Sequence, residues 1–312
     1  MSALICGSFA YDNIMVFPDQ FKNHILPDKI HMLNVSFLVP EMRREYGGCA
    51  GNIAYNLNLL GGDPLPMGVV GSDFSPYAAW MDECGVSRAH VVQIDAAFTA
   101  QAFITTDLDD NQITAFHPGA MNYAARNNIA DADNISIGIL APDGRDGMVQ
   151  HAAQFVEAGV PFIFDPGQGM PMFDGDDLKH FIDQATWVTA NDYESELMQE
   201  RTGWSAEEIA GRVDALIVTR GGEGSVIYSS SGVVEIPTAP ATSITDPTGC
   251  GDAYRAGLLY GLMNELGWDT TGRIASLCGT IKIESAGTQN HSFTRDSFAA
   301  RYAEAFGQPL NW

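Results

Sequence analysis

The chain has 312 residues, of which 46% are hydrophobic, so it can form one large globular domain with a full core. Its 16 basic and 39 acidic residues give a formal net charge of −23, which argues against nucleic acid and anionic membranes as partners. The five cysteines are scattered without a CxxC pair, which excludes a disulfide framework or zinc site of the usual spacing. Because no signal peptide or membrane-spanning apolar run is recognisable, we expect a soluble cytoplasmic protein.

Short aliphatic runs alternate with helical patterns from the N-terminus to about residue 219. The expected strands are residues 3–6, 66–70, 90–94, 137–141, 161–165, 187–190 and 215–219. The expected helices are residues 50–60, 74–84, 146–158, 192–202 and 206–213. Nearly apolar strands separated by helices predict an α/β fold, in which a mostly parallel sheet is covered by helices on both faces.

Beyond residue 215 the order of elements changes. A strand is followed by a hairpin of residues 225–229 and 233–237, which predicts an antiparallel edge on the sheet. Three helices follow, over residues 250–266, 271–284 and 295–306. The pattern indicates a single three-layer α/β/α domain over residues 1–312, without a clean internal boundary.

Two segments interrupt the alternation of strands and helices. Residues 12–46 carry scattered large apolar side chains, and residues 101–116 form two alternating strands, "QAFITTDL" and "NQITAFHP", joined by the turn residues Asp109 and Asp110. We expect a small, discontinuous β layer from about residues 12–46 and 97–118. Such a layer can serve as a lid over a site or as an ordinary extension of the sheet, and the pattern alone favours neither.

The stretch "DPTGCGD", residues 246–252, combines glycines with a carboxylate at the start of a helix. Unsatisfied N–H groups and the helix dipole make such a start an anion site, and Gly249 and Gly251 allow close approach. Asp252 could take a proton from an attacking hydroxyl while the N–H groups hold a transferring phosphoryl group. For a bare GxGD, an ordinary helix N-cap is the simpler explanation. The motif lacks the lysine of a P-loop, and the single glycine of "ICGSFAYDN" disfavours a dehydrogenase.

Other polar residues stand near strand ends or helix starts. In "YGGCAGN", the glycines allow close ligand approach and Asn52 suits hydroxyl recognition, although a tight turn reads alike. Asp12 follows the first strand, where ligands of open α/β sheets collect, but a turn residue is the simpler explanation. Asn191 and Glu194 could orient a magnesium-bound water or form a capping box. The turn "TRGGEGS" is suited to lie against a nucleotide, although any hairpin turn would show the same pattern.

The order of these motifs along the chain is more informative than each alone. The segments "GGCAGN", "NDYE", "TRGGEG" and "DPTGCGD" resemble, in sequence order, those of the ribokinase-like (PfkB) kinase family. Within it, "DPTGCGDAYRAG", "ITAFHPGAM" and "DPGQ" are similar to the bacterial type of adenosine kinase. The resemblance implies a ribokinase-like fold and transfer of the γ-phosphoryl group of ATP to the 5′-hydroxyl of adenosine, giving AMP.

The resemblance also implies roles for individual residues. Asp252 looks like the general base, and the anion hole looks like the backbone of Gly249, Cys250 and Gly251. The implied ribose ligands are Asp12, Gly47, Gly48 and Asn52. The implied nucleobase contacts are Ser8, Phe103, Phe116, Met121 and Gln168, the aromatic rings by stacking. Asn191 and Glu194 would organise Mg²⁺ and phosphates, with Glu194 acting through water, and ATP would be bordered by Thr219, Gly221 and Gly224.

Several residues depart from the family pattern, and the sequence leaves alternative functions open. Cys250 stands where the family usually has alanine, and its thiolate should be favoured at a helix start. Glycines at positions 167 and 169 leave recognition of the base unsettled. A sugar kinase acting on a pentose or hexose such as ribose or fructose is the alternative within the family, and a non-catalytic nucleoside-binding regulator is the alternative outside it. The family resemblance is compatible with K⁺ activation and a homodimer, and no residue decides either.

Overall fold

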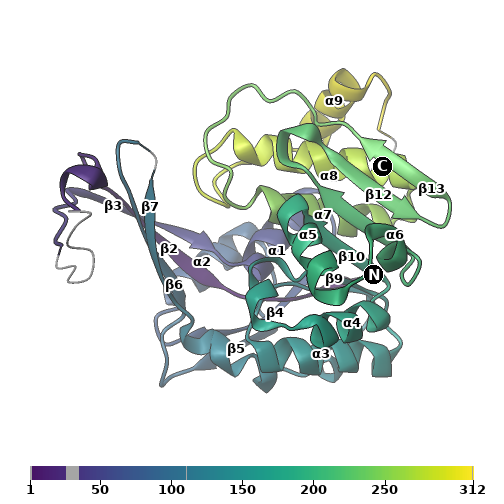
Figure 1. Ribbon diagram of the computed structural model, residues 1–312, viewed down its shortest axis with the longest axis horizontal. Coiled ribbons are helices and arrows are strands. Elements are labelled where there is room, and N and C mark those ends of the chain that lie inside the picture. Colours follow the sequence, from purple (N-terminus) through teal and green to yellow (C-terminus); the bar gives the residue numbers. More distant parts are fainter. Residues whose placement is uncertain (1, 26–34, 110, 311) are drawn as a thin grey trace.

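The computed structural model describes residues 2–25, 35–109, 111–310 and 312, which form two β-sheets and their surrounding helices (Figure 1). The strands of the large sheet are β1 (Ser2–Cys6), β4 (Pro64–Gly71), β5 (His90–Ile94), β8 (Ile135–Leu140), β9 (Phe162–Phe164), β10 (Trp187–Asn191), β11 (Ala215–Thr219), β12 (Ser225–Ser229) and β13 (Gly232–Ile236). The strands of the small sheet are β2 (Ala10–Val16), β3 (Glu41–Gly47), β6 (Ala100–Thr106) and β7 (Gln112–His117).

The large sheet has the strand order β13-β12-β11-β10-β9-β8-β1-β4-β5. All neighbours from β11 to β5 run parallel, and β12 and β13 add an antiparallel edge. Strands that follow in sequence move outward from β1 in both directions, so the sheet has a topological switch point between β1 and β8. In open α/β sheets, ligands bind outside the carboxyl ends of the strands at such a point.

Helices cover both faces of the large sheet. The α-helices are α1 (Cys49–Leu59), α2 (Ser75–Cys84), α3 (Arg145–Ala158), α4 (Gly175–Gln184), α5 (Asp192–Thr202), α6 (Ala206–Ala210), α7 (Cys250–Met263), α8 (Trp268–Ile283) and α9 (Arg295–Phe306). Short 3₁₀ helices are η1 (Phe21–Asn23), η3 (Gly119–Arg126), η4 (Ile129–Asp131), η5 (Gly167–Met172) and η6 (Gly221–Glu223). One apolar core packs α1, α2, α7, α8 and α9 on the sheet, and a second packs α3, α4, α5 and α6.

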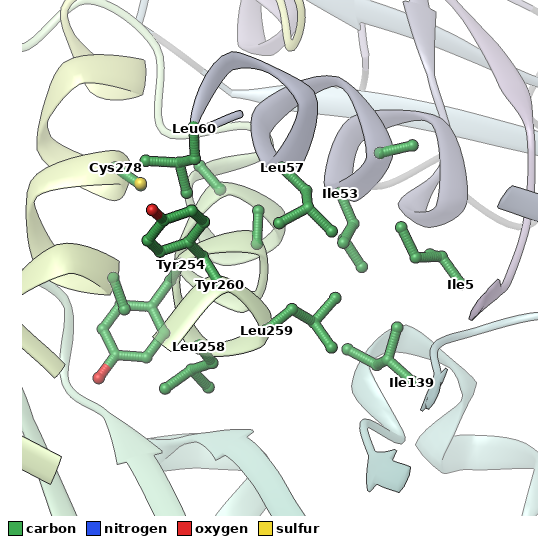
Figure 2. Packing of buried hydrophobic residues seen from close by; sticks show 14 of the residues in the cluster. Ile5, Ile53, Leu57, Leu60, Ile139, Tyr254, Leu258, Leu259, Tyr260 and Cys278 are labelled. Carbon is green, nitrogen blue, oxygen red and sulfur yellow. The ribbon is translucent and has the colours of Figure 1, made fainter. Parts of the chain in front are cut away.

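The alternation of side chains along β1 shows why two cores form. Ala3 and Ile5 belong to the first core, whereas Leu4 and Cys6 belong to the second, because successive residues of a strand point to opposite faces. In Figure 2, Ile5 lies among apolar side chains of α1 and α7. A central strand buried on both faces therefore reads as a continuous apolar run, which made β1 recognisable from sequence.

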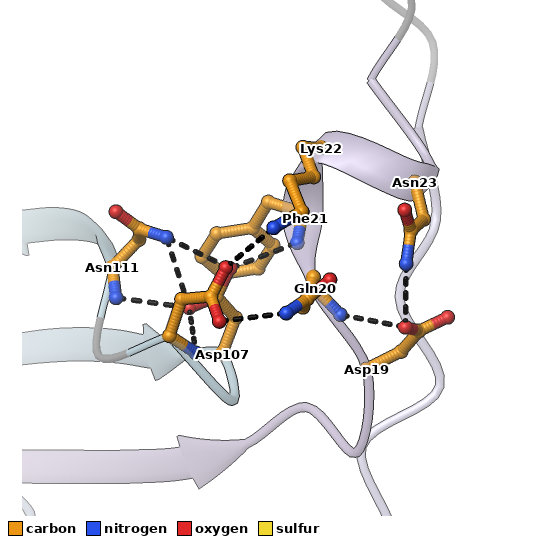
Figure 3. A network of polar contacts seen from close by, with 8 residues as sticks. Asp19, Gln20, Phe21, Lys22, Asn23, Asp107 and Asn111 are labelled. Atoms are coloured by element: carbon orange, nitrogen blue, oxygen red, sulfur yellow. Dashed lines mark hydrogen bonds and ion pairs between the residues drawn. The ribbon is translucent and has the colours of Figure 1, made fainter.

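The small sheet has the order β3-β2-β6-β7 and projects from one side of the large domain (Figure 1). Its outer end is held by the buried carboxylate of Asp107, which accepts hydrogen bonds from the backbone N–H groups of Phe21, Asp109 and Asn111 (Figure 3). The β6–β7 turn is thereby tied to η1. Of the two turn residues expected from sequence, Asp110 lies outside the described residues.

Most of the expected elements are present, and the α/β/α fold is confirmed. Two differences have local causes. Helix α6 ends at Ala210 and not at residue 213, since Gly211 follows it. Helix α4 was not expected, although Asp174 forms a capping box with Asp177 at its start and Leu178, Phe181 and Ile182 give it a buried face. Among the described helices, none is long and apolar enough to cross a membrane.

Candidate active site

The polar residues singled out in the sequence collect along one edge of the large sheet. Ser8 follows β1, Asp165 follows β9, and Asn191 and Thr219 are the last residues of β10 and β11, where they lie opposite each other in register. Parallel strands bring all these carboxyl ends to the same side. The start of α7 contributes Asp252 to the same region, since its carboxylate is bonded to α1.

Helix α7 begins with an anion-binding geometry. Gly249 precedes it with φ of 80°, a left-handed conformation that favours glycine. The N–H of Cys250 donates to the carbonyl of Pro247 at 3.2 Å, whereas the N–H groups of Gly251 and Asp252 have no acceptor among the described residues. Of the expected anion hole of residues 249–251, only the N–H of Cys250 has an acceptor within the described chain. The N–H of Gly249 also has no acceptor among the described residues, so three donors at the start of a 14-residue helix remain for an oxyanion.

The carboxylate of Asp252 is held by Asn52 of α1. Asn52 Nδ2 donates to Asp252 Oδ2 at 2.8 Å. Burial raises the pKa of Asp252 to about 6, against the lowering effect of this hydrogen bond and of the nearby Arg255 guanidinium. Asp252 is thus a stronger base than an exposed aspartate while it remains ionised at neutral pH.

A buried amide fixes the orientation of Asn52. Gln289 Nε2 donates to Asn52 Oδ1 at 3.0 Å and to the hydroxyl of Tyr77 at 2.6 Å, and Gln289 Oε1 accepts from Trp80 Nε1 at 2.9 Å. Because Asn52 Oδ1 accepts from Gln289, its amide nitrogen must face Asp252. Asn52 was expected to contact ribose; here it positions Asp252, and Nδ2 keeps one further proton. Sequence spacing gave no sign of Gln289, which lies 237 residues away.

Asp12 of β2 lies against the glycine turn that precedes α1. A Cβ atom at Gly47 would be 2.6 Å from Asp12 Oδ2, so only glycine leaves this space open. Gly48 has φ of 86°, and its Cβ would be 2.5 Å from the carbonyl oxygen of Ser8. Burial, followed by the charges of Asp246 and Glu45, raises the pKa of Asp12 to about 6. The turn therefore packs tightly beside a second perturbed carboxylate.

A buried ion pair connects α7 with the loop after β9. Arg255 donates from Nε and Nη2 to the two carboxylate oxygens of Asp165, each at 3.0 Å, and both side chains are buried. The sequence marked both residues only as features of a subfamily. The pair holds the loop that carries Gln168 against the helix that carries Asp252.

On the nucleotide side, Asn191 and Glu194 form the capping box that their spacing allowed. Asn191 Oδ1 accepts from the Glu194 N–H at 2.7 Å, and Glu194 Oε2 accepts from the Asn191 N–H at 2.8 Å. Burial raises the pKa of Glu194. Among the described residues, its Oε1 has no hydrogen-bond partner and no cluster of three acidic or other ligating side chains occurs. One free carboxylate oxygen fits Mg²⁺, which binds through few protein ligands, waters and substrate phosphates.

The glycine turn after β11 adjoins the capping box. Thr219 ends β11 opposite Asn191, and Gly221 and Gly224 have φ of 53° and 88°. A Cβ at Gly224 would come within 2.0 Å of the carbonyl oxygen of Ile236, so the hairpin itself requires this glycine. Gly221 has open space around it. The turn thus leaves room beside Gly221, whereas Gly224 has a structural reason that is independent of any ligand.

The two aromatic residues expected to stack on one nucleobase lie on opposite faces of the small sheet. In the β6–β7 register, Phe103 is opposite Ala115 and Phe116 is opposite Ala102, and Ala102 is in turn opposite Asp12. Residues opposite each other share a face, so only Phe116 lies on the face of Asp12. Phe103 therefore lies on the opposite face of the small sheet in this chain, because one residue of offset in a strand reverses the face.

The remaining expected base contacts differ in exposure. Ser8 is buried and its Oγ accepts from the Cys49 N–H at 3.3 Å. Met121 is half-buried in η3, and Gln168 is exposed in η5. No hydrogen bond within the described chain engages the Gln168 amide, which leaves that side chain free to reach a ligand.

The thiol of Cys250 does not behave as its position at a helix start suggested. Burial raises the pKa of Cys250 to about 11, with a smaller lowering effect from the Lys282 ammonium. The side chain points toward the carbonyl oxygen of Asp246, at 3.9 Å, and not toward the free N–H groups. The expected thiolate is therefore corrected: desolvation outweighs the helix dipole at this position.

The chain is similar to known kinases over most of its length. The sequence pattern of pfkB family carbohydrate kinases matches residues 12–295. The chain is 31% identical to a nucleoside kinase of Methanocaldococcus jannaschii over 270 residues, which are 86% of this chain and 89% of that protein. It is also similar to the structure of Burkholderia thailandensis nucleoside kinase in complex with inosine, with a TM-score of 0.90 and 53% identity over 98% and 99% of the two chains.

A more distant structure supports the fold alone. Arabidopsis thaliana ribokinase complexed with ribose and ATP has a TM-score of 0.77 and 18% identity, and the match covers 96% of this chain and 98% of that one. The family match spans most of the chain, and the relatives match over nearly their whole length. The chain therefore belongs to the pfkB family of carbohydrate kinases and is an ATP-dependent phosphotransferase.

Proposed function

We propose that this kinase phosphorylates the 5′-hydroxyl of a nucleoside, with adenosine as an acceptor that yields AMP. The observation that carries the proposal is the Asp252 carboxylate, hydrogen-bonded to Asn52 at 2.8 Å beside the free N–H groups of α7. A nucleoside is favoured over a free sugar by the 53% identity to a nucleoside kinase whose structure is in complex with inosine. That relative makes inosine a second acceptor to be measured.

In the proposed reaction, Asp252 accepts the proton of the attacking 5′-hydroxyl. The new bond forms between the 5′-oxygen and the γ-phosphorus as the bridging P–O bond breaks, and ADP leaves with that electron pair. In a loose transition state the proton moves late, so a carboxylate with a pKa of about 6 is basic enough. The N–H groups of Gly251 and Asp252 stabilise the phosphoryl oxygens.

Two further carboxylates have supporting parts in the proposal. Asp12 accepts a hydrogen bond from a ribose hydroxyl, and the absence of a side chain at Gly47 leaves the space that the Asp12 carboxylate itself occupies. Glu194 would hold Mg²⁺ through a water, using the oxygen that the capping box leaves free. When bound, Mg²⁺ neutralises charge on the phosphates.

The small β-sheet is proposed to act as a lid over the acceptor and to exclude water. Phe116 supports this, since it lies on the Asp12 face and its ring is 53% exposed without a ligand. Saturating nucleoside should slow amide hydrogen exchange in β6 and β7. Unchanged exchange there, with slowed exchange at the start of α7, would remove the support for closure.

The proposed function is tested with a panel of acceptors and one variant. Initial rates with ATP and Mg²⁺ are compared for adenosine, inosine, ribose and fructose, and a preference for a free sugar would reject the nucleoside assignment. Asp252→Asn should lower kcat by about 10³-fold or more while calorimetry still detects nucleoside binding. Asp296→Asn, also in the first turn of a helix but exposed on α9, is the matched control. Binding by the wild-type protein without ADP release would favour a regulatory role.

A further inference from the structure

Lys282 is a fully buried lysine without a carboxylate partner. It lies in the last turn of α8, and its side chain has 0% exposure. Its Nζ donates to two backbone carbonyl oxygens, those of Asp246 at 2.6 Å and Ser285 at 3.1 Å. Among the described residues, no carboxylate oxygen lies within 4.0 Å of this nitrogen. Buried charges are costly and are normally paired, so this arrangement needs a reason.

The carbonyl that Lys282 holds belongs to the loop that begins the anion-binding helix. The N–H groups of Thr245 and Asp246 donate to the carbonyl of Ile283, and the Asp246 carboxylate accepts from the N–H groups of Thr248 and Gly287. Residues 245–248 are thus tied to the end of α8. Helices α7 and α8 lie side by side in Figure 1. The ammonium therefore contacts the loop through the Asp246 carbonyl.

The charge of Lys282 reaches the groups of this loop. Against the raising effect of burial, hydrogen bonds from Thr248 and Gly287 lower the pKa of Asp246, and the Lys282 charge adds a smaller lowering effect. Burial raises the pKa of Cys250, and the Lys282 charge opposes that rise.

Acidic groups also act on this region, since, after burial, the Asp246 charge raises the pKa of Asp12 and the Asp252 charge raises that of Cys250, and the Arg43 guanidinium is a second cation near Lys282. The chain as a whole has a net charge of −23. A triphosphate approaching this region meets repulsion that a fixed cation can offset.

We propose that the buried Lys282 ammonium is a built-in cation that positions the loop of residues 246–249 and stabilises negative charge at the start of α7 during phosphoryl transfer. Lys282 acts through the Asp246 carbonyl, so it is a positioning residue and does not touch the substrate. The proposal depends on the phosphoryl-transfer chemistry of the family and not on which alcohol is the acceptor. A structural role alone would require only donors for two carbonyls, which a neutral side chain can supply.

Two variants separate charge from hydrogen bonding. Lys282→Gln keeps an N–H₂ donor on a side chain that is one bond shorter, and Lys282→Met removes both charge and donors while filling most of the volume. Lys179→Met removes the same charge from the surface of α4 and is the control. For each protein, kcat and KM for ATP, the Kd of the nucleoside and the urea midpoint are measured. Rates of Lys282→Met are repeated in ammonium, K⁺ and choline chloride at constant ionic strength.

If the charge acts, both Lys282 variants should lose about tenfold or more in kcat with little change in nucleoside Kd, and the control should not. Ammonium or K⁺ should restore the Met variant several-fold relative to choline, while the wild type changes by less than twofold. A Gln variant with wild-type kcat would overturn the proposal. So would a folded Met variant whose low rate is the same in all three salts. All variants are compared with the same acceptor. The effect of Lys282 on kcat can therefore be measured even if the preferred acceptor is not a nucleoside.

Discussion

Replacing the proposed base should make the protein more stable at neutral pH while it abolishes turnover. The pKa of Asp252 is raised from 3.8 to about 6 by burial. Above pH 6 the carboxylate is ionised in both the folded and the unfolded chain, and the folded chain bears the desolvation cost. Asp252→Asn removes that charge and keeps an oxygen that can accept from Asn52. The free energy of unfolding should therefore rise.

The size of the gain follows from the shift in the Asp252 pKa. A rise of about two pKa units corresponds to about 3 kcal/mol, which is the upper limit because the carboxylate is half-buried. The shift in the pKa also determines how the stability difference between the variant and the wild type changes with pH. As pH falls from about 6 toward 4, the folded wild-type protein takes up the proton first, so its penalty disappears and the two proteins should become equally stable.

Urea unfolding at pH 7.5, 6 and 5 measures this difference. Asp246→Asn is the control with the opposite sign, because hydrogen bonds from Thr248 and Gly287 and the Lys282 charge lower the pKa of Asp246 against the effect of burial. That variant should be destabilised at pH 7.5. The reasoning is refuted if Asp252→Asn is less stable than the wild type at pH 7.5, or if its advantage does not shrink as the pH falls.

Three further predictions concern the same region. First, kcat/KM should fall below about pH 6, because Asp12 and Asp252, each with a pKa of about 6, must both be ionised. A profile that stays flat to pH 5 would contradict their roles. Second, Asp165→Asn should cost about 3–5 kcal/mol in urea unfolding, since it leaves the buried Arg255 unpaired, and Arg255→Met in the same chain should recover part of the loss. Third, Gly48→Ala should cost about 3 kcal/mol or more, from a left-handed φ and a 2.5 Å contact, whereas Gly85→Ala, with φ of 72° and open space, should cost about 1 kcal/mol; equal costs would show that the contact does not matter.

Local signals account for the parts of the site that sequence could predict. The left-handed glycine before α7 and the capping box of Asn191 and Glu194 each depend on residues within a few positions of one another. The same holds for the apolar runs that became the strands of the large sheet. Such patterns specify where a helix starts or a strand lies, because backbone geometry and hydrogen bonding are satisfied locally.

Long-range contacts account for what sequence did not reveal. The bond between Asn52 and Asp252 spans 200 residues, and that between Gln289 and Asn52 spans 237. Nothing near Lys282 in the sequence marks it as buried, since its burial arises where α8 meets the loop before α7. The opposite faces of Phe103 and Phe116 follow from the register of β6 with β7, in which one residue of offset would reverse the result.

By itself, then, the sequence determined the α/β class, the helix starts that offer N–H groups, and the family, because each depends on patterns that are continuous along the chain. Only the tertiary structure decided which of those groups meet. It directed the Asn52 amide toward Asp252, left two N–H groups of α7 free and buried an ammonium against the loop that precedes them. These are properties of packing, since burial and charge proximity arise when distant segments exclude water from one another.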